Sequence, residues 1–129
     1  MALSLLVLAA CDTMISHRIR ITAVATQDHA EAPAGEAVVA FVRDTLSAQG
    51  MKKGPHFVRE VGEVWEWKDP NNPPGLRATI EPLGAGSVQV RLSQGLYGPI
   101  GETDKYKSVK QALIDGGRRR FGRKSVQVG

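Results

Sequence analysis

The sequence predicts an α+β fold, a two-layer sandwich in which two helices cover one face of an antiparallel sheet of about four strands. Two observations lead to this prediction. Several stretches carry apolar residues at every second position, which is typical of half-buried strands. Two other stretches carry them three and four positions apart, which is typical of helices that pack on a core. The predicted order is a strand, a helix, three strands and a helix, and residues 125–128 fit either a short final edge strand or a loose tail.

The first strand and the first helix are predicted in the N-terminal third of the chain. Residues 18–25 alternate, and four apolar side chains share one face of the expected strand: Ile19, Ile21, Ala23 and Ala25. Residues 36–49 are predicted as a helix because four apolar side chains form a stripe along it: Val38, Phe41, Val42 and Leu46. Glu36 suits the positive end of the helix dipole, and Gly50 is a common type of residue just after a helix.

The middle of the chain predicts a three-stranded antiparallel meander. Residues 57–67 are predicted as one long strand, after a turn at residues 51–55. Residues 76–83 and 88–92 alternate on either side of a glycine-rich turn, which indicates a hairpin. Trp65 and Trp67 point to the same face of their strand. We expect them in the core beneath the helices, whereas an open face would make them an aromatic recognition patch.

The second helix is expected to begin near Asp104, with Thr103 as its N-cap. Its apolar stripe consists of Tyr106, Val109 and Leu113. Gly116 and Gly117 follow, and each glycine costs a helix about 1 kcal/mol relative to alanine. The helix is therefore expected to end or bend at this pair.

The chain begins with an uncharged, mostly apolar stretch at residues 2–10. A membrane-spanning helix needs about twenty apolar residues, so this stretch is too short to be one. Its length fits the apolar core of a signal peptide, which needs roughly 7–15 residues. Ala9 and Ala10 are small enough for the narrow cleft of a peptidase, and the only cysteine of the chain, Cys11, follows directly.

The tetrapeptide Leu8-Ala9-Ala10-Cys11 resembles the lipobox of bacterial lipoproteins, whereas the rest of the chain resembles no family that we recognise. The resemblance implies that residues 1–10 are a signal peptide that is removed. Cys11 would carry acyl chains such as palmitate, residues 11–17 would be a lipidated linker, and residues 18–129 would be a single α+β domain. Asp12 resembles the signal that keeps such proteins in the inner membrane. The chain departs from the pattern in having no Lys or Arg before the apolar stretch.

A different interpretation makes Cys11 an ordinary buried thiol of a cytosolic protein, with residues 2–10 as a first strand or helix. In a variant of it, translation begins at Met14. The lipoprotein interpretation explains better why an exported chain would contain one unpaired cysteine.

The net charge favours anionic partners. Lys and Arg number 17 and Asp and Glu 13, which gives a formal net charge of +4. Aromatic residues are few and form no stacking pattern with the basic ones, so we expect no nucleic-acid partner. Anionic headgroups and other polyanions of the cell envelope are the nearest candidates for a lipid-anchored protein.

The sequence contains no P-loop, dinucleotide fingerprint or nucleophile elbow. We therefore expect no enzymatic activity, no cofactor and no metal. The histidines have no metal-ligand spacing and are expected on the surface or in loops: His17, His29 and His56. Three glutamates are expected to pair across strands with Arg77 or Arg91: Glu60, Glu63 and Glu66.

The strongest charge cluster is Arg118-Arg119-Arg120. It fits a solvated helix end, where the dipole favours cations, or a contact with an anionic lipid surface. The sequence as a whole predicts a lipid-anchored cell-envelope protein on the periplasmic face of the cell membrane, with the inner membrane favoured over the outer. It would be a non-enzymatic binding or assembly component that meets an envelope protein partner. The alternative is a soluble cytosolic or periplasmic α+β protein with a regulatory or small-ligand-binding role.

Overall fold

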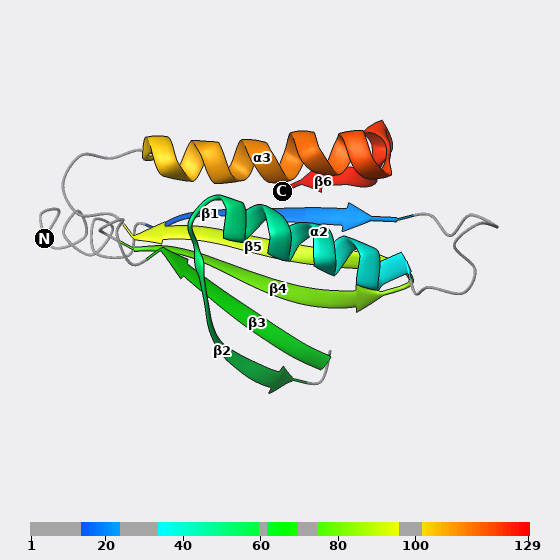
Figure 1. Ribbon diagram of the computed structural model, residues 1–129, viewed down its shortest axis with the longest axis horizontal. Helices are drawn as coiled ribbons and strands as arrows, with labels where there is room; N and C mark the ends of the chain where they lie inside the picture. Colours follow the sequence, from blue (N-terminus) through cyan, green and yellow to red (C-terminus); the bar gives the residue numbers. More distant parts are fainter. Residues whose placement is uncertain (1–13, 24–33, 60–61, 70–74, 96–101) are drawn as a thin grey trace, which may run out of the picture.

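The computed structural model describes residues 14–23, 34–59, 62–69, 75–95 and 102–129 (Figure 1). Its elements are, in order, β1 (Met14–Thr22), α2 (Ala34–Ala48), β2 (Lys52–Arg59), β3 (Gly62–Asp69), β4 (Leu76–Gly84), β5 (Ser87–Gly95), α3 (Asp104–Phe121), the 3-10 helix η2 (Arg123–Ser125) and β6 (Val126–Val128). The strands form one antiparallel sheet in the order β2-β3-β4-β5-β1-β6. The α+β class is confirmed, with two α-helices in the described residues. The expected four strands are too few, because this part of the chain contains six.

The middle of the chain is where the predicted strands are wrong. Residues 57–67 form two strands and not one, because Arg59 pairs with Gly62 and Phe57 with Val64 in a β2–β3 hairpin. Residues 52–55 of the predicted turn belong to β2. Two arms of a hairpin that are in phase show the same period-two pattern as one long strand, so the pattern alone does not separate them. The β4–β5 hairpin around its glycine-rich turn is confirmed.

The first and the last described strands pair with each other in the sheet. β1 begins at Met14, four residues before the predicted strand, and lies between β5 and β6 (Figure 1). The expected final edge strand is confirmed, since β6 pairs with β1 over residues 126–128. Gly129 extends this pairing, because its backbone N–H and C=O bond to the C=O and N–H of Arg18 at 2.8 and 2.9 Å.

Both helices lie on the same face of the sheet (Figure 1). The predicted apolar stripes are confirmed as core, since five of their residues are fully buried in addition to Tyr106: Val38, Val42, Leu46, Val109 and Leu113. Thr103 is the N-cap of α3, as predicted, and its hydroxyl accepts a hydrogen bond from the Tyr106 N–H at 3.2 Å.

The predicted end of the second helix at Gly116 and Gly117 is wrong, because α3 continues to Phe121. Both glycines are buried where α3 comes closest to its neighbours. A Cβ on Gly116 would lie 2.9 Å from the ring of Phe41 in α2, and one on Gly117 would lie 2.9 Å from Cγ2 of Val126 in β6. The glycines therefore permit close packing, and this gain outweighs their poor helix propensity.

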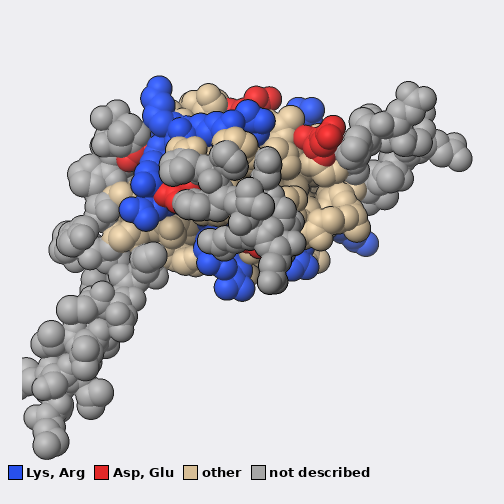
Figure 2. Space-filling model, turned by 90° about the horizontal axis from the view of Figure 1, so that it is seen from below, with Lys and Arg blue, Asp and Glu red and all other residues tan. Residues whose placement is uncertain are grey.

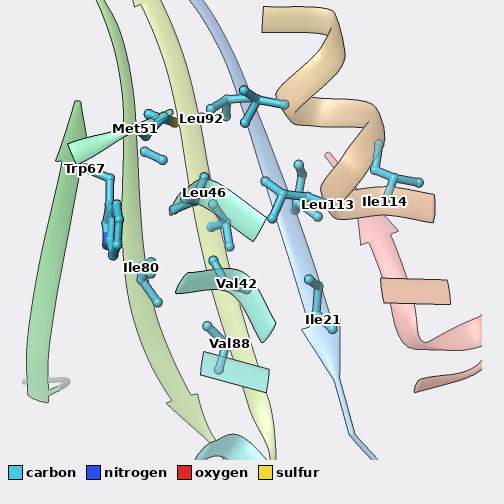
Figure 3. Packing of buried hydrophobic residues seen from close by; sticks show 14 of the residues in the cluster. Ile21, Val42, Leu46, Met51, Trp67, Ile80, Val88, Leu92, Leu113 and Ile114 are labelled. Atoms are coloured by element: carbon cyan, nitrogen blue, oxygen red, sulfur yellow. The ribbon is translucent and has the colours of Figure 1, made fainter. Parts of the chain in front are cut away.

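The core is continuous beneath both helices (Figure 3). Trp67 is only 6% exposed and lies beside Met51 and Ile80, as expected for a core residue. Trp65 is half-buried against the same core, and the Nζ atom of Lys53 lies 3.7 Å from its ring centroid. The two tryptophans therefore do not form an open aromatic patch.

Candidate functional site

The sheet face that the helices leave uncovered carries arginines on three adjacent strands. Side chains alternate along a strand, so the outward residues form rows across the sheet. Arg18 of β1 lies directly opposite Arg91 of β5, and Arg20 is the next outward residue of β1. Arg77 of β4 lies two residues from Thr79, which is the partner of Arg91. The four arginines are all exposed and follow a diagonal from β1 to β4.

Two lysines continue this series from Arg77 straight across the strands to the edge of the sheet. Lys68 of β3 lies opposite Arg77, and Lys52 of β2 lies opposite Lys68. Both lysines are exposed. We refer to the six side chains together as the basic band: Arg20, Arg18, Arg91, Arg77, Lys68 and Lys52.

The basic band is poorly neutralised. Like charges directly opposite each other destabilise a sheet, and the band contains three such pairs. Among the described residues, its arginines form no ion pair with a carboxylate, and the only salt bridge is 3.3 Å long, between Lys68 and Glu66 of the same strand. The expected pairing of Glu66 with Arg77 or Arg91 is therefore wrong, because the neighbour two residues along its own strand is nearer. The side chains of Glu60 and Glu63 lie outside the described part of the chain.

Neutral hydrogen-bonding groups surround one end of the basic band. Arg20 has Gln89 of β5 on one side and Gln127 of β6 on the other. A hollow of about 290 Å³ lies here, lined by Arg18, Arg20, Gln89, Gln127, Val128 and Gly129. The guanidinium and amide N–H groups that line this hollow are suitable donors to the oxygens of a phosphate or a similar anion.

Basic side chains also dominate other parts of the surface. Figure 2 views the molecule from the β2 side and shows its largest group of Lys and Arg toward the left, the end at which β1 and α3 begin in Figure 1. Lys52 and Lys68 of the basic band lie at this end, as does Lys105 in the first turn of α3.

Replacing Arg91 with glutamine is expected to stabilise the fold by about 0.2–1 kcal/mol at low ionic strength, because the repulsion with Arg18 is removed. Urea denaturation in low salt measures this, and high salt should abolish the gain by screening the charges. Arg119→Gln is the matched control, since Arg119 is an exposed arginine in the last turn of α3. A loss of stability in Arg91→Gln would show that Arg91 is balanced by a favourable contact.

A second group of polar residues lies under the start of α3. The Tyr106 hydroxyl is fully buried and donates to the carbonyl oxygen of Leu92 at 3.1 Å. His17 Nδ1 lies 2.7 Å from the same hydroxyl oxygen. Because the hydroxyl hydrogen is directed to the Leu92 carbonyl, the hydroxyl oxygen is the acceptor in this second hydrogen bond and Nδ1–H of His17 is the donor. Glu102 lies 3.8 Å from His17 Nδ1 and forms a salt bridge with Lys110.

Gln94 connects the same region to β5. Its side-chain oxygen accepts from the backbone N–H and the hydroxyl of Thr103 at 3.2 and 2.7 Å, and the residue is only 1% exposed. The polar groups of this region thus bond chiefly to one another, as a structural network requires. They join the start of α3 to β1 and β5.

The network shifts the acidity of two of its members. The hydrogen bond from Lys110 lowers the pKa of Glu102, and the charges of Lys110, His17 and Lys107 act in the same direction against partial burial. Burial raises the pKa of Tyr106 to about 12, and the negative charge of Glu102 also raises it.

His17, predicted on the surface or in a loop, lies in a strand with a partly exposed side chain. It belongs to β1, is about 30% exposed and faces α3 together with Ile19 and Ile21. His56 lies in β2 and not in a loop, although its side chain is outside the described part, and His29 is outside the described residues. His17 has the same parity as Ile19 and Ile21, so the strand pattern contained the signal for its position.

Replacing Glu102 with glutamine is expected to reduce the loss of unfolding free energy that the protein undergoes as the pH becomes acidic. A carboxyl whose pKa is lowered by folding stabilises the fold above its unfolded pKa, and this contribution is lost as the pH falls through the folded value. The wild type should therefore lose more stability than Glu102→Gln below about pH 4. Urea midpoints at pH 7 and at acidic pH measure the difference, and equal losses in both chains would contradict the role of the Lys110 pair.

A cleft of about 710 Å³ lies between the first half of α2 and the β4–β5 turn. Its described lining is mainly apolar, with Val39, Pro82 and Val88, and it includes the charged residues Glu36 and Arg43. Its volume is in the range of small-molecule sites.

The candidate site residues predicted from the sequence lie outside the basic band. Cys11 and Asp12 lie outside the described residues. Arg118, Arg119 and Arg120 are exposed in the last turn of α3. In the described ranges, no three His, Cys, Asp or Glu residues are grouped as metal ligands, and no helix is long and apolar enough to cross a bilayer.

Sequence reasoning missed the basic band as a unit. The pattern does place Arg18, Arg20, Arg77 and Arg91 on the polar faces of their strands. It does not give the strand order β4-β5-β1, which brings them together. No protein-family model matches the chain, and no curated protein matches it by sequence.

Proposed function

We propose that this chain is a lipid-anchored protein of the bacterial cell envelope, on the periplasmic face of the membrane, and acts there as a non-enzymatic binding or assembly component. The observation that carries the binding role is the basic band, which exposes six cations along one sheet face with little neutralisation. Like charges directly opposite each other destabilise the sheet. Proteins retain such unfavourable contacts where a function requires them.

The position of β1 supports the anchor. Only Asp12 and Thr13 separate Cys11 from Met14, the first residue of β1. Three residue steps span at most about 10 Å, so lipids on Cys11 hold this end of the sheet next to the bilayer. The group of Lys and Arg side chains that Figure 2 shows toward this end then lies near the headgroups, where each basic residue near an anionic surface contributes about 1 kcal/mol.

The geometry limits the proposed role of the arginine triplet. Arg118 lies in the last turn of α3, about 21 Å along the helix from Asp104, which is at the β1 start. Arg118, Arg119 and Arg120 contact the anchoring membrane only if α3 lies along its surface. An upright molecule presents the triplet to solvent, where a protein partner can reach it.

The intact mass of the protein expressed in a bacterium tests the anchor, with Cys11→Ser as the control. The expected mass lacks residues 1–10 and includes acyl chains, and the control lacks the acyl chains. An unmodified chain that retains residues 1–10, or begins at Met14, contradicts the anchored function and favours the soluble alternative.

Retention on an immobilised sulfated polysaccharide tests the binding surface. The double variant Arg18→Gln/Arg91→Gln should elute at clearly lower salt than Arg119→Gln/Arg120→Gln, although both lose two positive charges. Equal elution would mean that net charge and not the basic band governs binding, and the proposed docking surface would be rejected.

The cleft beside α2 favours a second candidate function, the binding of a small ligand by a soluble protein. Its volume and its mainly apolar lining with two opposite charges suit a small amphiphilic molecule. Saturable chemical-shift changes confined to α2 and the β4–β5 turn in a ligand screen would support this candidate over the first.

A further inference from the structure

We infer that the basic band is a track for a linear polyanion with phosphate-type groups, bound through its anionic backbone. The inference rests on the proposed function, in which the basic band is the docking surface, and it names the class of ligand.

The arrangement of the band is linear. Neighbouring strands lie about 4.8 Å apart, so the four steps from β1 to β2 cover about 19 Å across the sheet. Between Arg20 and Arg77 the band also shifts along the strands by four residues, about 13 Å. The cations therefore follow a diagonal of about 23 Å, with directly opposed neighbours about 5 Å apart and diagonal neighbours about 7–8 Å apart. The band is thus a continuous, stepped series of cations in which each lies about 5–8 Å from the next, and it matches a flexible polymer that carries a negative charge on each repeat.

The chemistry of the band favours phosphate groups. Four of its six residues are arginines, whose planar guanidinium binds two oxygens of one phosphate. Gln89, Gln127 and Thr79 lie on the same face beside the arginines and add neutral donors. The described outward residues of β1, β4 and β5, the strands that carry the four arginines, include no aromatic side chain, so these three strands offer no platform for stacking bases.

The shape of the sheet favours a polymer over a bilayer. Antiparallel sheets twist, so their open face is a saddle and not a plane. A flat membrane touches only part of a diagonal on such a face. A flexible polymer follows the whole band and can neutralise its four arginines, which form no ion pair with a carboxylate of the described residues.

Titration calorimetry of the full chain with Cys11→Ser tests the inference, with inorganic polyphosphate as the probe. Long-chain polyphosphate should bind much more tightly per chain than tripolyphosphate, because only the long chain spans the basic band. The logarithm of the binding constant should fall with the logarithm of the salt concentration with a slope of about −4, as expected when all six cations of the band contact a single-stranded polyanion. Arg18→Gln/Arg91→Gln should weaken binding about tenfold or more and reduce this slope by about 1.4, whereas Arg119→Gln/Arg120→Gln should change neither.

Vesicles of anionic phospholipid are the competing probe. If they bind the chain tightly through the basic band while long polyphosphate binds no better than tripolyphosphate, the polymer inference is overturned and the docking surface stands. If the two double variants weaken binding equally for every probe, both the inference and the proposed docking surface fail. Circular dichroism of the variants controls for folding, and these exposed substitutions should leave the spectrum unchanged.

Discussion

Gly117→Val is expected to destabilise the protein by about 2–3 kcal/mol, a large fraction of the stability of a small domain. Even a single added Cβ meets Val126 Cγ2 at 2.9 Å and Ile21 Cδ1 at 3.5 Å, and valine adds two more methyl groups in the same space. The gain in helix propensity over glycine is smaller than this cost. Urea denaturation at neutral pH measures the change.

Gln111→Val is the matched control, because Gln111 is an exposed residue of the same helix. It should cost only a few tenths of a kcal/mol through helix propensity and the loss of its contact with Asp115. Equal effects of the two substitutions would mean that α3 does not approach β6 as closely as the structure shows.

Tyr106→Phe is expected to cost about 1–3 kcal/mol and to remove a transition at alkaline pH. The substitution leaves the carbonyl of Leu92 and Nδ1 of His17 without their hydroxyl partner in a buried position. In the wild type the pKa of Tyr106 is raised to about 12, so folding disfavours the tyrosinate. The stability from this group is complete below its unfolded pKa of about 10 and is lost as the pH rises to about 12.

Two measurements separate these effects. Urea midpoints from pH 8 to pH 11 should decline more steeply in the wild type than in Tyr106→Phe. Ultraviolet titration of Tyr97→Phe, which leaves Tyr106 as the only tyrosine, should show tyrosinate appearing near pH 12 and not near 10. Ionisation at the ordinary pH would place the hydroxyl in solvent and would contradict the network.

Local patterns predicted most of the individual elements. The helix stripes depend only on spacing along the chain, and Thr103 caps α3 because a hydroxyl at that position reaches the Tyr106 N–H. The β4–β5 hairpin has a glycine-rich turn between alternating runs, so its two strands were separable. The β2–β3 hairpin lacks such a contrast, and its two arms looked like one strand.

Long-range pairing was not predictable from local patterns. Gly116 and Gly117 are poor helix residues, and only the packing of Phe41 and Val126 against them explains why α3 continues. The basic band likewise depends on β1 joining β5, since Arg18 and Arg91 are far apart in the chain. Each arginine had an outward position in its own strand, but their shared surface arises from strand order.

The place of β1 in the sheet has a consequence for the kinetics of folding. Its partners β5 and β6 lie about 70 and about 110 residues further along the chain. Pairings across such separations form slowly, because a long loop must close before any contact rewards it. We expect the hairpins from β2 to β5 to form first and β1 to dock late, with β6 completing the sheet. Until then β5 has an unpaired edge, which is a template for association with other chains. β1, which is synthesised before β5 and β6, is thus the strand that protects the folding intermediate from aggregation.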